Sequence, residues 1–243
     1  MAARALVAEF VGSAILLLAV VGSGIMAERL CGGNVGLALL ANSIATGGAL
    51  IALLLAFGPI SRAHLNPAVT LVDAWQGGVS WRLVLPYIGA QIAGALVGTA
   101  LADGIFGLPL FSASHHDRGG LALVISEFVA TFGLLLTIWG CARSRPAATP
   151  FAVAAYIAGA YWFTPSTSFA NPAVTLARSL TDTFAGIRPI DAPLFIVAQL
   201  LGAIAATALF AFLSPISKAT AEAVVVAHPE VHRARTSAGA AHR

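Results

Sequence analysis

Two identical five-residue segments contain the residues best suited to act on a solute. Asn66-Pro67-Ala68-Val69-Thr70 recurs as Asn171-Pro172-Ala173-Val174-Thr175, and each copy stands between long apolar stretches. Asn is a favourable N-cap and Pro suits the first helical position, so each copy is expected to open a short helix at membrane depth. The Asn carbonyl oxygen can then cap backbone N–H groups, which leaves its NH2 group free to donate into a pore.

The two helix starts would also set the electrostatics of the centre. Each helix dipole places partial positive charge at its N-terminal Asn. Cations and protons are repelled from such a point, whereas small neutral hydroxylated solutes can accept hydrogen bonds there. A single Asn-Pro-Ala is an ordinary helix start, but two identical copies in matched parts of one chain favour a pore.

Composition points to a polytopic protein of the lipid bilayer. Of the 243 residues, 58% are hydrophobic and 9% are charged, whereas an average soluble domain is roughly 25% charged. The sequence pI of about 9.3 does not indicate nucleic-acid binding, because the positive charges fall between apolar spans and in the C-terminal tail. Cys31 and Cys141 are expected at opposite membrane faces and therefore unpaired.

Six stretches are long and apolar enough to cross a bilayer as helices, which takes about 20 residues each. We predict them at about residues 5–27, 35–57, 82–101, 121–141, 148–163 and 194–213. Gly58-Pro59 is expected to end the second of them. The segments that follow Asn66, to about Gln76, and Asn171, to before Gly186, are too short to span and are predicted as half-helices.

The two parts of the chain, about 1–103 and 121–214, repeat one another. Residues 8–13 match 126–131 and residues 90–95 match 198–203, in the same order as the two Asn-Pro-Ala segments. Because three spans is an odd number, the halves insert in opposite senses, as an inverted repeat. The sequence thus predicts an all-α membrane protein with one channel domain, 1–214, and a disordered cytoplasmic tail, 215–243.

The positive charges predict the orientation. Nine of the thirteen Lys and Arg residues fall in the segments on the same side as the two termini. Cytoplasmic segments carry such an excess, so both termini are expected in the cytoplasm of a cell (inner) membrane protein.

Glu9 in the first span and Glu127 in the fourth stand at matching places. An intramembrane carboxylate is expensive and usually faces the bundle interior. The symmetry of the pair, and the lack of a basic partner in the spans, favours a structural acceptor for the loops before the half-helices over a proton relay. His64, two residues before Asn66, is expected to line the inner vestibule as a hydrogen-bonding residue.

No enzyme, cofactor or metal site is predicted. The adjacent His115 and His116 lack further ligands and are interpreted as loop residues. No intramembrane nucleophile is paired with a base.

Together these features resemble the aquaporin or major intrinsic protein family. The resemblance covers about residues 5–213 and implies six spanning and two half-helices in a right-handed bundle, one pore per subunit and a homotetramer. The family's selectivity filter has four positions, which counting from each Asn-Pro-Ala segment carries over to Thr46, Gly159, Ser168 and Val174. The count to Gly159 leaves its neighbours Ala158 and Ala160 as alternatives.

The candidate filter departs from the family's pattern. Members normally have Arg directly after the second Asn-Pro-Ala, where this chain has Val174. Water-specific members tend to place a bulky aromatic and a His where Thr46 and Gly159 stand. Loss of the Arg removes a fixed cation and a fork of donors, so we expect a wider, less polar filter that admits solutes larger than water. Arg178, one helical turn on, is interpreted as a surface charge of the half-helix, with a side chain turned toward the pore mouth as the alternative.

The stretch from Ser168 to Pro189 resembles the bacterial aquaporin-like channels of arsenic-resistance systems. This resemblance makes neutral trivalent arsenic acids, which display hydroxyls as glycerol does, the leading solute. The alternative is a general water and glycerol channel. A secondary transporter is a third hypothesis, since transporters also use inverted repeats, but only Glu9 and Glu127 could couple an ion.

Overall fold

The computed structural model describes residues 2–213, and within that range it contains helices and loops without strands. The tail predicted for 215–243 lies outside the described residues. In chain order the helices are α1 (Ala2–Leu30), α2 (Val35–Ser61), α3 (Pro67–Trp75), α4 (Trp81–Ile105), α5 (Leu121–Ser144), the 3-10 turn η1 (Pro146–Ala148), α6 (Thr149–Phe163), α7 (Pro172–Arg178) and α8 (Ala192–Leu213).

The long helices fit a membrane. By length and composition α1, α2, α4, α5 and α8 can each cross a bilayer. Helix α6 has 15 residues and follows the 3-10 turn, because Pro146 and Pro150 restrict how the helix can start. It packs between α2 and α5 and corresponds to the fifth predicted span, 148–163.

Helix α2 continues through Pro59, so the prediction that Gly58-Pro59 ends it was wrong. Proline removes one hydrogen bond near the end of the helix, and the last turn still forms to Ser61. The helix ends at Arg62, which has a left-handed backbone conformation with φ of 70° and whose N–H donates to the Gly58 carbonyl.

The two halves pack in the same way. Helix α1 lies against α2 and α4, and its counterpart α5 lies against α6 and α8. Gly94 of α4 lets that helix lie against the Phe10 carbonyl of α1, and Gly202 of α8 does the same at the Phe128 carbonyl of α5, where a Cβ would clash. The repeat in the sequence is therefore a repeat in helix packing.

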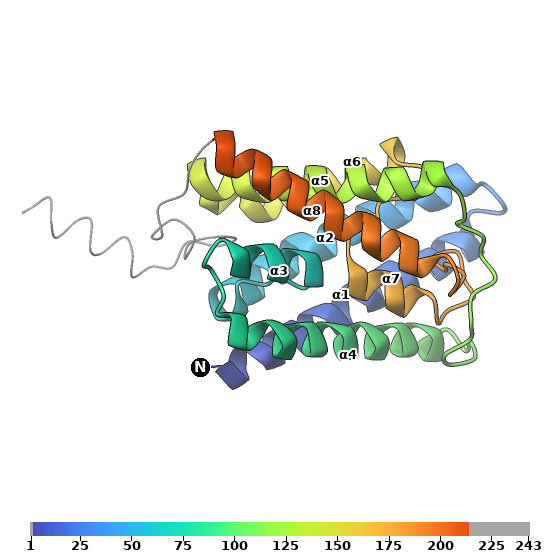
Figure 1. Ribbon diagram of the computed structural model, residues 1–243. Coiled ribbons are helices and arrows are strands. Elements are labelled where there is room, and N and C mark those ends of the chain that lie inside the picture. Colours follow the sequence, from blue (N-terminus) through green and yellow to red (C-terminus); the bar gives the residue numbers. More distant parts are fainter. Residues whose placement is uncertain (1, 214–243) are drawn as a thin grey trace, which may run out of the picture.

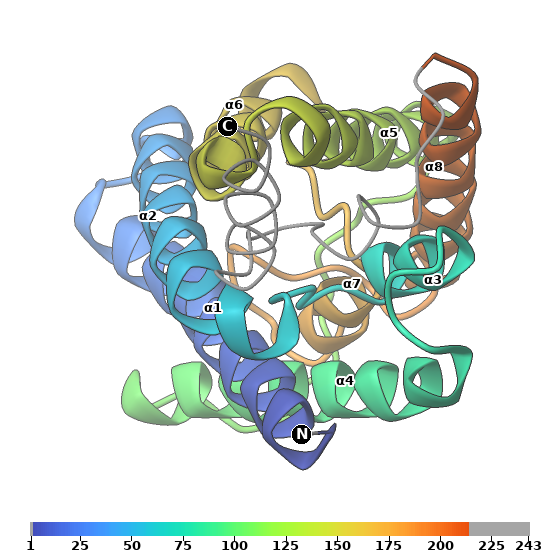
Figure 2. The same cartoon turned by 90° about the vertical axis from the view of Figure 1, so that its left-hand side faces the viewer.

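Helices α1, α2, α6, α5 and α8 follow one another around the bundle to α4, and the short helix α3 lies between α8 and α4, with α7 nearer the middle (Figure 2). Helices α3 and α7 enter from opposite ends of the bundle, and their N-termini meet near its middle (Figure 1). This arrangement brings the two Asn-Pro-Ala segments together although they are far apart in the sequence.

Candidate pore and selectivity filter

The two Asn residues cap the short helices. Both have extended backbone conformations, with φ of −158° for Asn66 and −160° for Asn171. Oδ1 of Asn66 accepts from the Ala68 N–H at 2.9 Å, and Oδ1 of Asn171 accepts from the Ala173 N–H at 3.0 Å. Local sequence signals therefore account for both helix starts.

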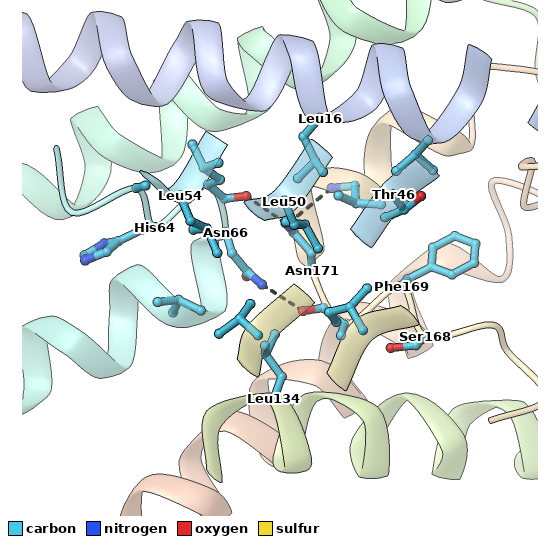
Figure 3. Close-up of a pocket in the computed structure, with 18 of the residues that line it drawn as sticks. Leu16, Thr46, Leu50, Leu54, His64, Asn66, Leu134, Ser168, Phe169 and Asn171 are labelled. Atoms are coloured by element: carbon cyan, nitrogen blue, oxygen red, sulfur yellow. Dashed lines mark hydrogen bonds between the residues drawn. The ribbon is translucent and has the colours of Figure 1, made fainter. Parts of the chain in front are cut away.

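Each Asn also donates a hydrogen bond to the opposite half of the chain. Nδ2 of Asn66 donates to the Ala170 carbonyl at 2.8 Å, and Nδ2 of Asn171 donates to the Leu65 carbonyl at 2.7 Å (Figure 3). The expectation that the NH2 groups are wholly free was wrong, because each uses one hydrogen on a carbonyl that no helix could pair. The second hydrogen of each NH2 group is left for the cavity between the half-helices.

Glu9 and Glu127 hold the loops that lead into the half-helices. Both are fully buried. Glu9 accepts four hydrogen bonds, from the N–H groups of His64 and Leu65 and from the side chains of Ser61 and Gln91. Glu127 accepts three, from the N–H groups of Phe169 and Ala170 and from the side chain of Gln199.

These bonds stabilise backbone that would otherwise be unfavourable. Leu65 and Ala170, which precede the two Asn residues, both have φ of 48°, a left-handed conformation that non-glycine residues rarely adopt. Neither carboxylate lines the cavity between the half-helices. The geometry therefore suits a structural acceptor and places both acids beside the solute path, outside it.

A narrow cavity of about 70 Å³ follows the junction of α3 and α7, with room for roughly five waters. His64 stands at its α3 end, Asn66 and Asn171 near the middle, and Thr46 and Ser168 toward the α7 end (Figure 3). The remaining wall is largely aliphatic, including Leu16, Val20, Leu50, Leu54, Val69, Leu134, Ile138, Val153 and Ile157.

Three of the four predicted filter residues, Thr46, Ser168 and Val174, line this cavity and are buried. Gly159 does not, and lies on an exposed part of α6. Its alternatives Ala158 and Ala160 do not line it either. An irregular loop separates Asn171 from α6, so the residue count across it is uncertain evidence for a position on the helix. An error of one residue moves the assigned position by about 100° around the helix axis.

Tyr161 is a residue of α6 that the sequence analysis did not name for the cavity. It lines the cavity, and its hydroxyl oxygen lies 3.2 Å from Oγ1 of Thr46. Val153, Ile157 and Tyr161 recur every four residues, which is the spacing of one helix face. That spacing was the signal in the sequence for the inward side of α6.

Arg178 also lines the cavity, so its interpretation as a surface charge was wrong. Its relative exposure is 2%, and its guanidinium lies over the Phe169 ring, with 3.4 Å from Cζ to the ring centroid. Its Nε donates to the Ala185 carbonyl. Helical side chains lean toward the helix N-terminus, which turns Arg178 back toward the centre of the cavity.

Arg118, from the loop between α4 and α5, contacts the same aromatic ring. Its Cζ lies 5.0 Å from the Phe169 centroid. Nε donates to the Gly186 carbonyl at 2.7 Å, and Nη1 donates to the Ser166 carbonyl at 3.0 Å. Burial lowers the pKa of Arg118 to about 10, so the side chain stays charged at neutral pH.

A different set of groups surrounds His64 at the α3 end. Nδ1 of His64 lies 3.1 Å from Oγ1 of Thr70, and its Nε2 lies 3.4 Å from Oδ2 of Asp73. Asp73 also binds Nη1 of Arg62 at 3.2 Å and accepts from the Val79 N–H at 2.7 Å. Asp73 is fully buried, so Arg62 neutralises a charge that would be costly alone.

Other polar residues named from the sequence lie away from the cavity. Cys31 and Cys141 are half-buried free thiols. His115, in the loop between α4 and α5, binds Asp182, in the loop between α7 and α8. Within residues 2–213 no group of three or more His, Cys, Asp or Glu side chains could hold a metal ion.

Comparisons with known proteins agree with this geometry. The family model described as Major intrinsic protein matches residues 1–163 and 144–238. "Aquaglyceroporin AqpS" of Rhizobium meliloti (strain 1021) is 53% identical over 210 residues, covering 86% of this chain and 90% of that protein. "Aquaporin Z" of Rhodopseudomonas palustris is 33% identical over 232 residues, covering 89% of this chain and 96% of that protein.

A shorter match and a solved structure extend the comparison. The "Glycerol uptake facilitator protein" of Streptococcus pneumoniae is 43% identical over 94 residues, covering 34% of this chain and 40% of that protein. The structure of the aquaglyceroporin from Plasmodium falciparum has a TM-score of 0.64 at 20% identity, covering 86% of this chain and 96% of that one. It confirms the predicted fold of six spans and two half-helices. The chain therefore belongs to the major intrinsic protein family, and it is a multi-pass membrane channel and not an enzyme.

Proposed function

We propose that this protein is a passive channel for small neutral hydroxylated solutes, with water and glycerol-sized polyols as its main solutes. The observation that carries the proposal is the lining of the cavity. Fixed polar groups stand at the middle and at both ends, and an aliphatic wall runs between them. A polyol offers hydroxyls to such polar groups and its CH groups to such a wall, so this lining fits a polyol closely.

Several polar atoms remain available to a solute. Ser168 Oγ has no hydrogen-bond partner within residues 2–213. Asn66 and Asn171 each retain one amide hydrogen beyond the one donated across the junction. A solute that accepts and donates hydrogen bonds along the cavity would satisfy groups that are otherwise left unpaired.

Neutral trivalent arsenic acids are the second candidate. Val174 in place of the family's Arg supports a filter wide enough for them, and they share glycerol's hydroxyl display. The relatives' names favour glycerol and water, because "Aquaglyceroporin" and "Glycerol uptake facilitator" occur among them. The general water and glycerol channel, the alternative named from the sequence, is thus better supported than an arsenite channel.

Passive flow is favoured over coupled transport because Glu9 and Glu127 stand outside the cavity with their oxygens occupied by protein donors. We further propose a homotetramer in the cell membrane with both termini in the cytoplasm. In that orientation α3 enters from the cytoplasm and α7 from outside.

Flux in liposomes that contain the purified protein tests the proposal. Water and glycerol are followed by light scattering, and arsenous acid by a trapped thiol reporter, for wild type, Val174→Arg and the matched control Val174→Leu. We expect the Arg variant to lose roughly tenfold in glycerol and arsenous acid flux while water flux persists, because it adds a charge and narrows the filter. The Leu variant should stay close to wild type.

Two outcomes would contradict the proposal. If the wild-type protein carried water but neither glycerol nor arsenous acid, the proposal that the channel admits solutes larger than water would be disproved. Flux that saturates with solute concentration and is lost in Glu127→Gln would favour a transporter.

A further inference from the structure

We propose that Arg178 is the selectivity-determining cation of this channel, displaced by one helical turn from the position where the family normally places its Arg. Val174 and Arg178 are four residues apart on α7 and line the same cavity. Four residues correspond to about 6 Å along a helix. The inference rests on the proposed channel function. It assigns ion exclusion to Arg178, which is not one of the four filter positions carried over from the family.

The guanidinium is held in one place by two contacts. It lies over the Phe169 ring at 3.4 Å from Cζ to the centroid, and Nε donates to the Ala185 carbonyl. A cation over an aromatic face is attracted by the ring's quadrupole. Because a planar group held at its ring contact and at Nε has little freedom to turn, the remaining part of the guanidinium keeps a constant direction.

That remaining part is not used by the protein. Within residues 2–213 the Nη groups of Arg178 make no hydrogen bond, and none of the ion pairs includes this residue. The side chain belongs to the cavity lining. The charge and the Nη donors are therefore directed at whatever occupies the cavity.

Arg118 acts as a positioning residue for this arrangement. It contacts the Phe169 ring and donates to the carbonyls of Ser166 and Gly186. Gly186 directly follows Ala185, whose carbonyl receives the bond from Arg178. Arg118 thus holds both supports of Arg178, the ring and the carbonyl segment, without lining the cavity itself.

Two functions that one Arg could serve are then divided between two positions. Val174 sets the width of the filter with an uncharged side chain. Arg178 supplies the positive charge that repels cations and the donors that neutral solutes can use. A channel built this way can be wide and still exclude ions.

The test measures uptake of the permanently charged guanidinium ion and of glycerol by the same liposomes. Its variants are Arg178→Gln, Arg178→Met and Arg178→Lys. Arg29→Gln is the matched control, because Arg29 also lies over a Phe ring, at 5.2 Å from Cζ to the Phe106 centroid, and donates to a backbone carbonyl, but lies outside the cavity.

We expect guanidinium uptake to rise at least about tenfold in the Gln and Met variants, while glycerol flux is retained, because one charge no longer opposes the cation. The Lys variant and Arg29→Gln should exclude guanidinium as wild type does. If the Gln or Met variant passes glycerol and still excludes guanidinium, the inference is overturned.

The Lys variant gives a second measurement on a conservative side chain. A lysine in a poorly hydrated site loses its charge more readily than in water, so guanidinium uptake should rise as pH increases from 7 to 10. Wild type over the same range controls for every other titrating group. A Lys variant that still excludes guanidinium at pH 10 counts against the inference. Absence of glycerol flux in the wild-type protein counts against the proposed function instead.

Discussion

The two half-helices begin with the same six residues, Asn-Pro-Ala-Val-Thr-Leu, but differ beyond this shared segment. Seven residues after the Asn, α3 has Asp73 and α7 has Arg178. Two residues before the Asn, the first half has His64 and the second has Phe169. In both halves these two positions touch, with His64 Nε2 3.4 Å from Asp73 Oδ2 and Arg178 Cζ 3.4 Å from the Phe169 centroid.

The shared groups build the frame. Gln91 donates to Thr70 at 2.9 Å and Gln199 donates to Thr175 at 2.8 Å, at equivalent places. Together with the two Glu residues these bonds fix the chain before each half-helix. The groups that differ face the two ends of the cavity. The acid at the α3 end is neutralised by Arg62, whereas no carboxylate pairs with Arg178 within the described residues.

Removing a carboxylate of the frame should have the largest effect. Glu9→Ala leaves four donors without an acceptor and Glu127→Ala leaves three. Because each buried unpaired donor costs about 1–3 kcal/mol, we expect losses of at least about 4 and about 3 kcal/mol. The measurement is the loss of the monodisperse peak after heating in detergent, and the exposed Glu28→Ala is the control. If both variants matched that control, the structural role would be disproved.

Removing the aromatic support of Arg178 should have the next largest effect. Phe169 is buried and also packs edge-on against Phe195, with centroids 5.4 Å apart. Phe169→Ala should cost about 3 kcal/mol and raise guanidinium uptake, because Arg178 loses its ring. His64→Ala, the equivalent change at the other end, should cost about 1 kcal/mol and leave guanidinium excluded. Equal uptake in the two variants would contradict the difference between the ends.

Local signals explain what could be predicted from the sequence. Asn followed by Pro encodes a helix start within three residues, and Glu9 and Glu127 stand out as single charges in apolar spans. The repeat then shows that these features belong together. The helix-start signal lies within one helical turn, and the two Glu residues occur at matching places in both halves. Neither signal depends on the conformation of a loop.

The prediction of the filter depended on loops, and one of its four residues, Gly159, does not line the cavity. The segment before Asn171 includes left-handed residues at Thr167, Ser168 and Ala170, so the number of residues between α6 and the Asn says little about which face of α6 points inward. The position of Arg178 depends on Ala185 and on Arg118, which is far away in the sequence. No periodic pattern records such contacts.

A smaller effect is expected from removing the acid at the α3 end. Asp73→Asn keeps an oxygen that can accept from the Val79 N–H but loses the charge opposite Arg62, whose side chain is 20% exposed. Solvent weakens such a pair, so we expect a loss of about 1 kcal/mol in the same heating assay. Guanidinium uptake should not change. An increase as large as that in Arg178→Gln would show that both ends control ions.

The smallest effect is expected from acid, which acts on a hydrogen bond between a histidine backbone N–H and a carboxylate. One such bond is buried and another is exposed. The His64 N–H donates to buried Glu9 at 3.0 Å, and the His115 N–H donates to exposed Asp182 at 2.8 Å. The hydrogen bond from the His115 backbone, and a second from its side chain, lower the pKa of Asp182 below its usual value of 3.8. A carboxylate with a lowered pKa stabilises the folded loop above pH 3.8, and this contribution is lost as pH falls through its folded pKa.

Hydrogen exchange at pH 6 and pH 3 measures this difference. We expect the protection factor of the His115 amide to fall roughly threefold at the lower pH, a small change because the contact is exposed. Asp182→Asn, which accepts through its amide oxygen and does not titrate, should abolish the change. The His64 amide should keep its protection, since it is released only when the bundle opens. Equal losses at both amides would mean that acid loosens the whole bundle, and the expected difference between the buried contact at Glu9 and the exposed contact at Asp182 would be disproved.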